Sequence, residues 1–303
     1  MWDNLLTEIG NGNFKSLARC ISLLENEVTG YEIFLQSLPA STVPVIGITG
    51  PPGAGKSTLV DSLIGQLAEQ GKKVAVLCVD PSSPFNLGAL LGDRIRMSSW
   101  YNHPHVFIRS LATRGSLGGL HPKIVEIADV CKAAAFDYVI VETVGVGQSE
   151  IEIAGLADCT VVVLVPEAGD EVQTMKAGLM EIADVFVVNK ADRPEADLFV
   201  RNLRLMLAPA FATHQQEIPV LKTIATAPQA ASELLEKINY LLDLHLKNER
   251  KSWLLAEKAY YLLQQQRMKD ISKQTLQQQI DTALQEANFN LYRFIQPMIE
   301  KKR

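Results

Sequence analysis

Residues 50–57 read Gly-Pro-Pro-Gly-Ala-Gly-Lys-Ser and leave this chain few folds to choose from. They fit the pattern GxxxxGK[ST], in which backbone N–H groups of a glycine-rich loop converge on phosphate oxygens. The apolar run Val45–Thr49 precedes the loop and reads as a strand, and the residues from Ser57 to about Glu69 read as a helix. The helix N-terminus adds positive potential at the same place. Strand, loop and helix in this order predict an α/β nucleotide-binding fold.

Short runs rich in β-branched residues alternate with helical stretches from Val45 to about Ile224. Several runs are apolar throughout, as are parallel strands that are buried on both faces. Helices between parallel strands imply crossover connections. We therefore expect a doubly wound, mostly parallel sheet. The expected strands are Val45–Thr49, Val74–Asp80, Val106–Ser110, Tyr138–Thr143, Thr160–Val165, Val185–Asn189 and Ile218–Thr223.

Strand signals are confined to the middle of the chain, which suggests three parts. We expect an N-terminal helical extension over residues 1–42, a nucleotide-binding domain over 43–248 and a C-terminal helical arm over 249–303. In the extension, Leu17, Ile21, Leu24 and Val28 recur at helical spacing. The arm carries an apolar stripe with no sheet left to cover, and such a face is usually buried against a partner. A homodimer through the arm is therefore predicted.

Charge and targeting signals narrow the function classes. The chain has 29 Lys and Arg against 34 Asp and Glu, a net charge of −5, so the basic excess of a nucleic-acid-coating protein is absent. We find neither a signal peptide nor an apolar run near the roughly 20 residues of a transmembrane helix. The four cysteines are scattered and form no CxxC pair. We expect a cytoplasmic protein that binds neither nucleic acid nor membrane.

Asn189-Lys190-Ala191-Asp192 fits N-K-x-D and follows an expected strand. An aspartate carboxylate accepts two hydrogen bonds from N1–H and the 2-amino group of guanine, whereas adenine presents a lone pair at N1. A backbone contact to the base is expected from residues 224–226. The pattern predicts a site for GTP and GDP. The residues expected to bind the nucleotide are Gly50, Pro51, Pro52, Gly53, Ala54, Gly55, Lys56, Ser57, Thr58, Gly145, Asn189, Lys190, Asp192, Ile224, Ala225 and Thr226.

Carboxylates follow two of the expected strands, at the edge where ligands bind in open α/β sheets. Glu142-Thr143-Val144-Gly145 occupies the place of a D-x-x-G element, with Glu in place of Asp. We expect Mg²⁺ to be held by Ser57, Asp80, Asp93 and Glu142, although a solvated charged loop remains an alternative for Asp93. We expect Lys56 to stabilise charge on the transferring phosphoryl group and Asp80 to assist hydrolysis.

The segments Gly50–Thr58, Val79–Ser83, Leu91–Met97, Ile108–Leu120, Glu142–Glu150 and Gly178–Asp192 together resemble the MeaB/ArgK family of P-loop GTPases. The resemblance implies a SIMIBI-class GTPase core with an N-terminal helical extension and a C-terminal dimerisation arm. It also implies a chaperone for a cobalamin-dependent acyl-CoA mutase of the methylmalonyl-CoA mutase type. A loop that relays the nucleotide state to the mutase would be Glu167–Gly178, including Asp170, Glu171, Gln173 and Lys176. Residues 84–90 depart from the family's more Gly- and Thr-rich segment.

Two other functions share this core and stay open. A metallochaperone GTPase of the nickel-insertion kind needs a Cys and His cluster near the nucleotide, which the sequence does not offer. A kinase or ATPase linked to transport of lysine, arginine or ornithine would use ATP, which conflicts with residues 189–192. Nucleotide preference discriminates the second alternative directly.

Overall fold

In a computed structural model, the chain forms two compact units, Met1–Leu254 and Leu255–Arg303. None of its described helices is both long and apolar enough to cross a membrane. The structure describes residues 1–80, 97–113, 120–145, 151–168, 177–211, 218–244, 249–268, 271–285 and 288–300.

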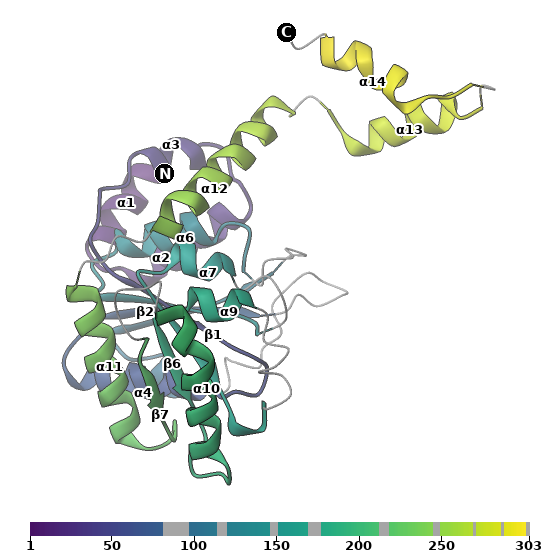
Figure 1. Cartoon of the computed structure of the whole chain (residues 1–303). Helices are drawn as coiled ribbons and strands as arrows, with labels where there is room; N and C mark the ends of the chain where they lie inside the picture. Colours follow the sequence, from purple (N-terminus) through teal and green to yellow (C-terminus); the bar gives the residue numbers. More distant parts are fainter. Residues whose placement is uncertain are drawn as a thin grey trace. The chain divides into compact units, whose positions relative to one another are not determined.

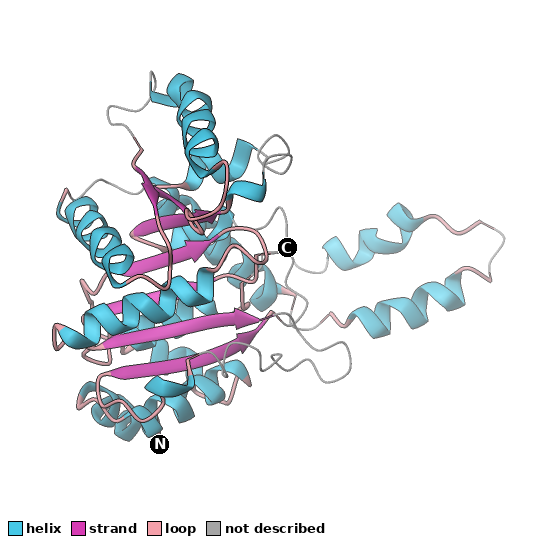
Figure 2. Ribbon diagram, turned by 90° about the horizontal axis from the view of Figure 1, so that it is seen from below, coloured by secondary structure: helices cyan, strands magenta, loops and turns pink. Residues whose placement is uncertain are grey.

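The first unit is built on a parallel sheet whose order, within the described residues, is β3-β2-β4-β1-β5-β6-β7. Every pair of neighbouring strands is parallel, and the arrows of Figure 2 run together across the sheet. The predicted doubly wound parallel sheet is thus confirmed, and strand ends differ from the expected ones by at most two residues. The strands are β1 Val45–Thr49, β2 Val74–Asp80, β3 Val106–Ala112, β4 Tyr138–Glu142, β5 Cys159–Leu164, β6 Val185–Val188 and β7 Val220–Lys222.

Helices cover both faces of the sheet because successive strand residues point to opposite sides. On one face, the helices α4 (Lys56–Glu69) and α11 (Pro228–Asp243) pack on Ile46, Ile48 and Val163 (Figure 1). On the other face, the strand residues Val45, Val139 and Val162 belong to a second core with the remaining helices. Those helices are α1 Trp2–Gly10, α2 Phe14–Glu25, α3 Tyr31–Gln36, α6 Ile124–Lys132, α7 Ile151–Leu156, α9 Ala177–Ile182 and α10 Ala196–Phe211.

The N-terminal segment is helical, as expected, but it forms three separate helices. Leu17, Ile21 and Leu24 are buried on one face of α2, whose N-terminus is capped by the side chain of Asn13. Val28 lies beyond the end of α2 and so does not extend that face. The division of the whole chain at residues 42 and 248 stays a prediction.

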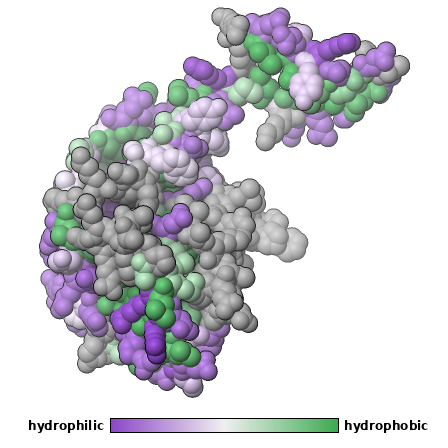
Figure 3. Space-filling model, in the orientation of Figure 1, coloured by the Kyte–Doolittle hydropathy of each residue, from purple (hydrophilic) through white to green (hydrophobic). Residues whose placement is uncertain are grey.

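The helix α12 (Glu249–Arg267) begins in the first unit and continues into the second, which also contains α13 (Lys273–Ala283) and α14 (Leu291–Glu300). Large apolar side chains of the second unit are exposed, and Figure 3 shows hydrophobic residues interspersed with hydrophilic ones on its visible face. Such surface is what the predicted homodimer would cover. The exposed side chains include Leu255, Tyr260, Leu263, Leu284, Leu291, Tyr292 and Ile299.

Candidate functional site

The loop between β1 and α4 takes its shape from glycines that no other residue replaces without strain. Gly50 has φ of +136°, and a Cβ there would lie 2.1 Å from the carbonyl oxygen of Val163. Gly55 has φ of +90°, and its Cβ would lie 2.3 Å from Nδ2 of Asn189. Both positions combine left-handed backbone with close packing, which only glycine tolerates. The loop is therefore pressed between β5 and the segment after β6.

Lys56 begins α4 and turns its side chain back over the loop. Its Nζ donates to the carbonyl oxygens of Gly50, at 2.8 Å, and Pro51, at 3.1 Å. Gly145, after β4, lies against the same ammonium, because a Cβ on Gly145 would stand 2.3 Å from Nζ. Lys56 is 94% buried, with a relative exposure of 6%. The structure thus brings together Lys56 and Gly145, both of which were predicted from the sequence to bind the nucleotide.

Buried carboxylates stand at the ends of the neighbouring strands β2 and β4. Asp80 ends β2 and Glu142 ends β4, and both are buried. Oε1 of Glu142 accepts a hydrogen bond from Oγ of Ser57 at 2.7 Å. The side chains of Ser57, Asp80 and Glu142 offer only oxygen atoms as metal ligands, and oxygen ligands suit a hard divalent cation. Asp93 lies outside the described residues.

A cavity of about 410 Å³ brings the phosphate loop and the carboxylates together. Thr143, which lines the cavity, shares a hydrogen bond with the hydroxyl of Thr49 at 2.9 Å, and this bond connects the ends of β1 and β4. Sequence reasoning had not singled out Val79, Thr143 or Val144 as lining residues, although each adjoins a residue that it had named. The cavity is lined by Pro52, Gly53, Gly55, Lys56, Ser57, Thr58, Val79, Asp80, Glu142, Thr143, Val144 and Lys190.

Asn189 braces three segments that are far apart in the sequence. Its buried Nδ2 donates to the carbonyl oxygen of Ala54 at 2.9 Å. Its Oδ1 accepts from the backbone N–H of Ala225 at 2.9 Å and from the hydroxyl of Thr223 at 3.3 Å. The phosphate loop, the N-K-x-D segment and the residues after β7 are therefore held as one body. Thr223 was not predicted from the sequence, because no sequence pattern indicates a tertiary contact of this kind.

The other two residues of the N-K-x-D segment lie nearer the surface. Lys190 has φ of +55°, and its Nζ donates to the carbonyl oxygen of Gly53 at 2.8 Å, which carries its stem across the mouth of the phosphate loop. Asp192 is exposed to solvent, and Ile224 and Thr226 after β7 are exposed as well. These exposed residues belong to the two segments that Asn189 joins through its hydrogen bond with Ala225.

An ion pair joins the segment after β6 to the loop that follows the neighbouring strand β5. Arg193, directly after Asp192, donates to the carboxylate of Glu167 in the short helix η2 (Pro166–Ala168). This hydrogen bond lowers the pKa of Glu167 below its usual value. The predicted relay residues Asp170, Glu171, Gln173 and Lys176 lie outside the described residues.

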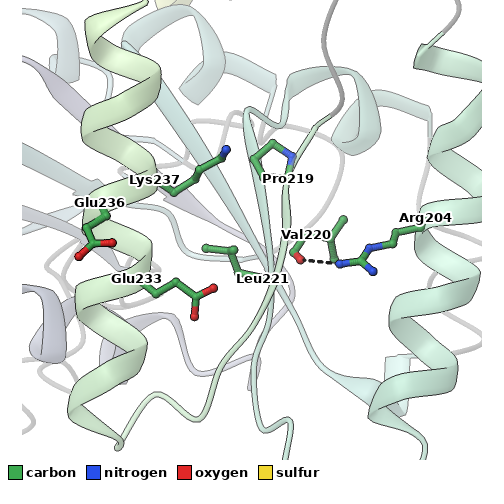
Figure 4. A pocket seen from close by; sticks show the side chains of 7 residues that line it. All are labelled: Arg204, Pro219, Val220, Leu221, Glu233, Glu236 and Lys237. Atoms are coloured by element: carbon green, nitrogen blue, oxygen red, sulfur yellow. Dashed lines mark hydrogen bonds between the residues drawn. The ribbon is translucent and has the colours of Figure 1, made fainter.

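A larger cavity of about 630 Å³ lies beside β7 and contains none of the predicted site residues. Figure 4 shows Arg204 on α10 donating to the carbonyl oxygen of Val220, and acidic and basic side chains of α11 on the opposite side. Its charges are mixed and it has no glycine-rich loop, so it offers no phosphate cradle. The cavity is lined by Arg204, Pro219, Val220, Leu221, Glu233, Glu236 and Lys237.

Known proteins are similar to this chain in sequence and in fold. Residues 17–281 match the family described as methylmalonyl-CoA mutase-associated GTPase MeaB. A Pyrococcus horikoshii protein named as a GTPase is 45% identical over 261 residues, which cover 84% of this chain and 81% of that protein. The mouse mitochondrial methylmalonic aciduria type A homolog is 36% identical over 219 residues, 67% of this chain and 52% of its own length.

A solved structure supports the same assignment. The crystal structure of a LAO/AO transport system kinase superposes with a TM-score of 0.65 and 26% identity, and covers 94% of this chain and 87% of that one. The match of a family over most of the chain, and the phosphate loop and sheet order that accompany it, leave one conclusion. The chain belongs to the MeaB family of P-loop GTPases, with the SIMIBI-class fold.

Proposed function

We propose that this chain is a GTP-hydrolysing chaperone that gates cofactor loading or protection of a cobalamin-dependent acyl-CoA mutase of the methylmalonyl-CoA mutase type. The observation that carries the proposal is the match to a mutase-associated GTPase family over residues 17–281. The mouse relative, whose name refers to methylmalonic aciduria, agrees with it. The site described above supports a working GTPase cycle.

Guanine selection is assigned to residues 189–192. Asn189 holds the phosphate loop and the loop after β7 in register, and the exposed carboxylate of Asp192 would accept from N1–H and the 2-amino group of guanine. Lys190 would lie along the base, because its Nζ already reaches Gly53. Ile224, Ala225 and Thr226 would supply the backbone contact to the base.

Phosphate binding is assigned to residues 50–58, with Gly145 beside them. The ammonium of Lys56 rests on loop carbonyls that are weaker partners than a phosphate, so we expect it to move to the β- and γ-phosphates. In the transition state it would stabilise charge on the transferring group. Gly145 N–H would sense the γ-phosphate, and Asp80 at the end of β2 would orient the attacking water or its metal neighbour.

The residues at the carboxylate end of the cavity fit Mg²⁺. Ser57, Asp80 and Glu142 offer oxygen donors only, and the hydroxyl of Ser57 already contacts Glu142 at 2.7 Å. When bound, Mg²⁺ would neutralise charge on the β- and γ-phosphates. We assign Ser57, Asp80, Glu142 and Asp93 to its binding, directly or through water.

The route to the partner is assigned to the loop from Glu167 to Gly178. The pair between Glu167 and Arg193 supports this assignment, because it links the start of that loop to the residue after Asp192. An exposed ion pair is worth little in stability, so it is suited to breaking and reforming as the nucleotide changes. We further propose a cytoplasmic homodimer formed by the C-terminal arm.

The metallochaperone alternative is disfavoured by the state of the cysteines. Cys20, Cys78, Cys131 and Cys159 are all buried. Burial raises the pKa of Cys20 to about 12 and also raises the pKa of Cys131 and of Cys159. Since the thiolate is the metal ligand, these thiols are poor candidates for a cargo site. The transport kinase alternative conflicts with guanine selection by Asp192.

The test is a binding and turnover assay against the mutase of the same organism. GTP- and GDP-bound forms should bind the mutase with different affinities, and by linkage the mutase should shift nucleotide affinity by the same factor. The mutase should also raise GTP turnover. Substitutions at Asp170, Gln173 or Lys176 should lower that stimulation more than the intrinsic rate. If no complex forms in any nucleotide state and turnover stays unchanged, the mutase is not the partner.

A further inference from the structure

Ser62 lies on α4, one turn beyond the phosphate loop, and contacts the loop that follows β7. Its Oγ donates to the carbonyl oxygen of Ala225. The carbonyl oxygen of Thr58, one helical turn back, lies 3.1 Å from the same hydroxyl. A hydroxyl has one proton to give, and the oxygen of Ala225 is the nearer acceptor. Ser62 thus connects α4 to a segment 163 residues away in the sequence.

The peptide groups around Ala225 are held on several sides. The N–H of Ala225 donates to Asn189 Oδ1 at 2.9 Å. Two residues earlier, the backbone of Thr223 makes two hydrogen bonds to the segment around Asn189. Its N–H donates to the carbonyl oxygen of Val188, and its carbonyl oxygen accepts from the N–H of Ala191. Ala225 itself is buried, with an exposure of 6%. Ser62 therefore fixes the remaining polar group of Ala225, its carbonyl.

The orientation of that carbonyl determines where the next N–H points. In a planar trans peptide, the carbonyl of one residue and the N–H of the next point to opposite sides. None of the described peptide bonds is cis. Because Ala225 C=O points to Ser62, the N–H of Thr226 points away from that serine. Thr226 is exposed, next to the segment that carries Asp192.

We propose that Ser62 is a positioning residue for recognition of the 6-oxo group of guanine. By fixing the Ala225–Thr226 peptide, it aims the N–H of Thr226 at the oxygen on C6 of the base. Adenine carries an amino group at this position, which would meet the N–H donor to donor. This inference rests on the proposed guanine site at residues 189–192. It concerns the backbone contact already assigned to residues 224–226, and what it adds is Ser62 as the residue that orients this contact.

A local role of Ser62 predicts something different. Serine within a helix often donates to the carbonyl four residues back, here Thr58, and that bond only adjusts the helix. Ser62→Ala would then change stability slightly and affect all nucleotides alike. The two roles differ in one measurable quantity, the ratio of affinities for GDP and for 6-thio-GDP. Sulfur at C6 is a weaker acceptor than oxygen, while N1–H and the 2-amino group are unchanged.

The experiment titrates the full chain with GDP and 6-thio-GDP in a calorimeter. For Ser62→Ala we expect GDP affinity to fall about fivefold, the worth of one ordinary hydrogen bond, and 6-thio-GDP affinity to fall less than twofold. Ser62→Thr keeps the hydroxyl and should restore the wild-type ratio. Thr7→Ala is the matched control, because it removes a hydroxyl that donates to Asp3 four residues back on α1, far from the loops.

Two results would overturn the inference. Equal losses for both nucleotides, or no loss for either, would leave Ser62 with a local role only. Asp192→Asn, run in parallel, tests the site on which the inference rests: it should weaken GDP and favour xanthosine diphosphate. If Asp192→Asn weakens GDP binding but Ser62→Ala leaves the ratio of GDP to 6-thio-GDP affinity unchanged, only the role of Ser62 is wrong. If Asp192→Asn leaves GDP affinity unchanged, the guanine site and the role of Ser62 both fall.

Discussion

Two glycines of the phosphate loop allow the contact between that loop and Asn189 to be measured. Gly53 and Gly55 both have left-handed backbone, with φ of +76° and +90°. A Cβ on Gly53 would meet nothing within 4 Å, whereas a Cβ on Gly55 would lie 2.3 Å from Nδ2 of Asn189. Gly53→Ala and Gly55→Ala therefore share the backbone cost and differ in the clash.

The expected magnitudes follow from these contacts. Alanine in the left-handed region costs about 1–2 kcal/mol, so this is the whole loss of unfolding free energy expected for Gly53→Ala. In Gly55→Ala the amide of Asn189 has to move, which breaks its two shortest hydrogen bonds, those with Ala54 and Ala225. Each is worth about 1 kcal/mol. We expect Gly55→Ala to be less stable than Gly53→Ala by about 2 kcal/mol.

The assay is urea unfolding of both nucleotide-free variants, with the wild-type chain as reference. Both transitions should keep the wild-type slope, so that the midpoints report stability. The same two glycine substitutions are also made in an Asn189→Ala variant. Because this variant lacks the hydrogen bonds of the Asn189 amide, Gly55→Ala should there lower the unfolding free energy little more than Gly53→Ala does. Equal losses in the two glycine variants would show that Asn189 does not brace the loop in this way.

The remaining predictions concern the nucleotide, catalysis and assembly. Asp192→Asn should favour xanthine over guanine nucleotides in calorimetric titrations, since an amide can donate where the carboxylate accepts; equal GTP and ATP affinity of the wild type would contradict the assignment. Lys56→Ala should abolish GTP hydrolysis, and Asp80→Ala should reduce it strongly while GDP binding is largely kept; a fully active Asp80→Ala variant removes that role. Truncation after Leu254, which packs on Gly155, should give a monomer by light scattering, against a dimer for the full chain.

Local sequence patterns predicted most of the fold. The strand, loop and helix around Gly50–Ser57 and the seven apolar runs were evident because each depends on neighbours in the sequence. Val28 was wrongly placed on the face of α2, because helical spacing alone does not show that the helix ends at Glu25. Sheet order also escapes such reading, because only the crossovers decide that β4 lies between β2 and β1.

The candidate site divides in the same way. Motif residues such as Lys56 and Asn189 were found from spacing, and the structure places Asn189 against Ala54 and Gly55, directly before Lys56. Contacts made by ordinary residue types were not found. Ser62 and Thr223 carry one hydroxyl each and fit no pattern, and their partners lie on other segments. The ion pair of Arg193 with Glu167 belongs to the same class, because nothing local connects charges 26 residues apart.

The placement of the site at strand ends has a consequence for hydrogen exchange. Asp80 and Glu142 are the last residues of β2 and β4, and Asn189 follows β6 directly. Amide protons of these strands are released only when the core opens, so they should exchange near the free energy of global unfolding. A nucleotide that binds only the folded chain should then slow the exchange of these amides by a factor of 1 + [L]/Kd, where [L] is the free nucleotide concentration and Kd its dissociation constant. Exchange at these amides would report nucleotide affinity without any labelled ligand.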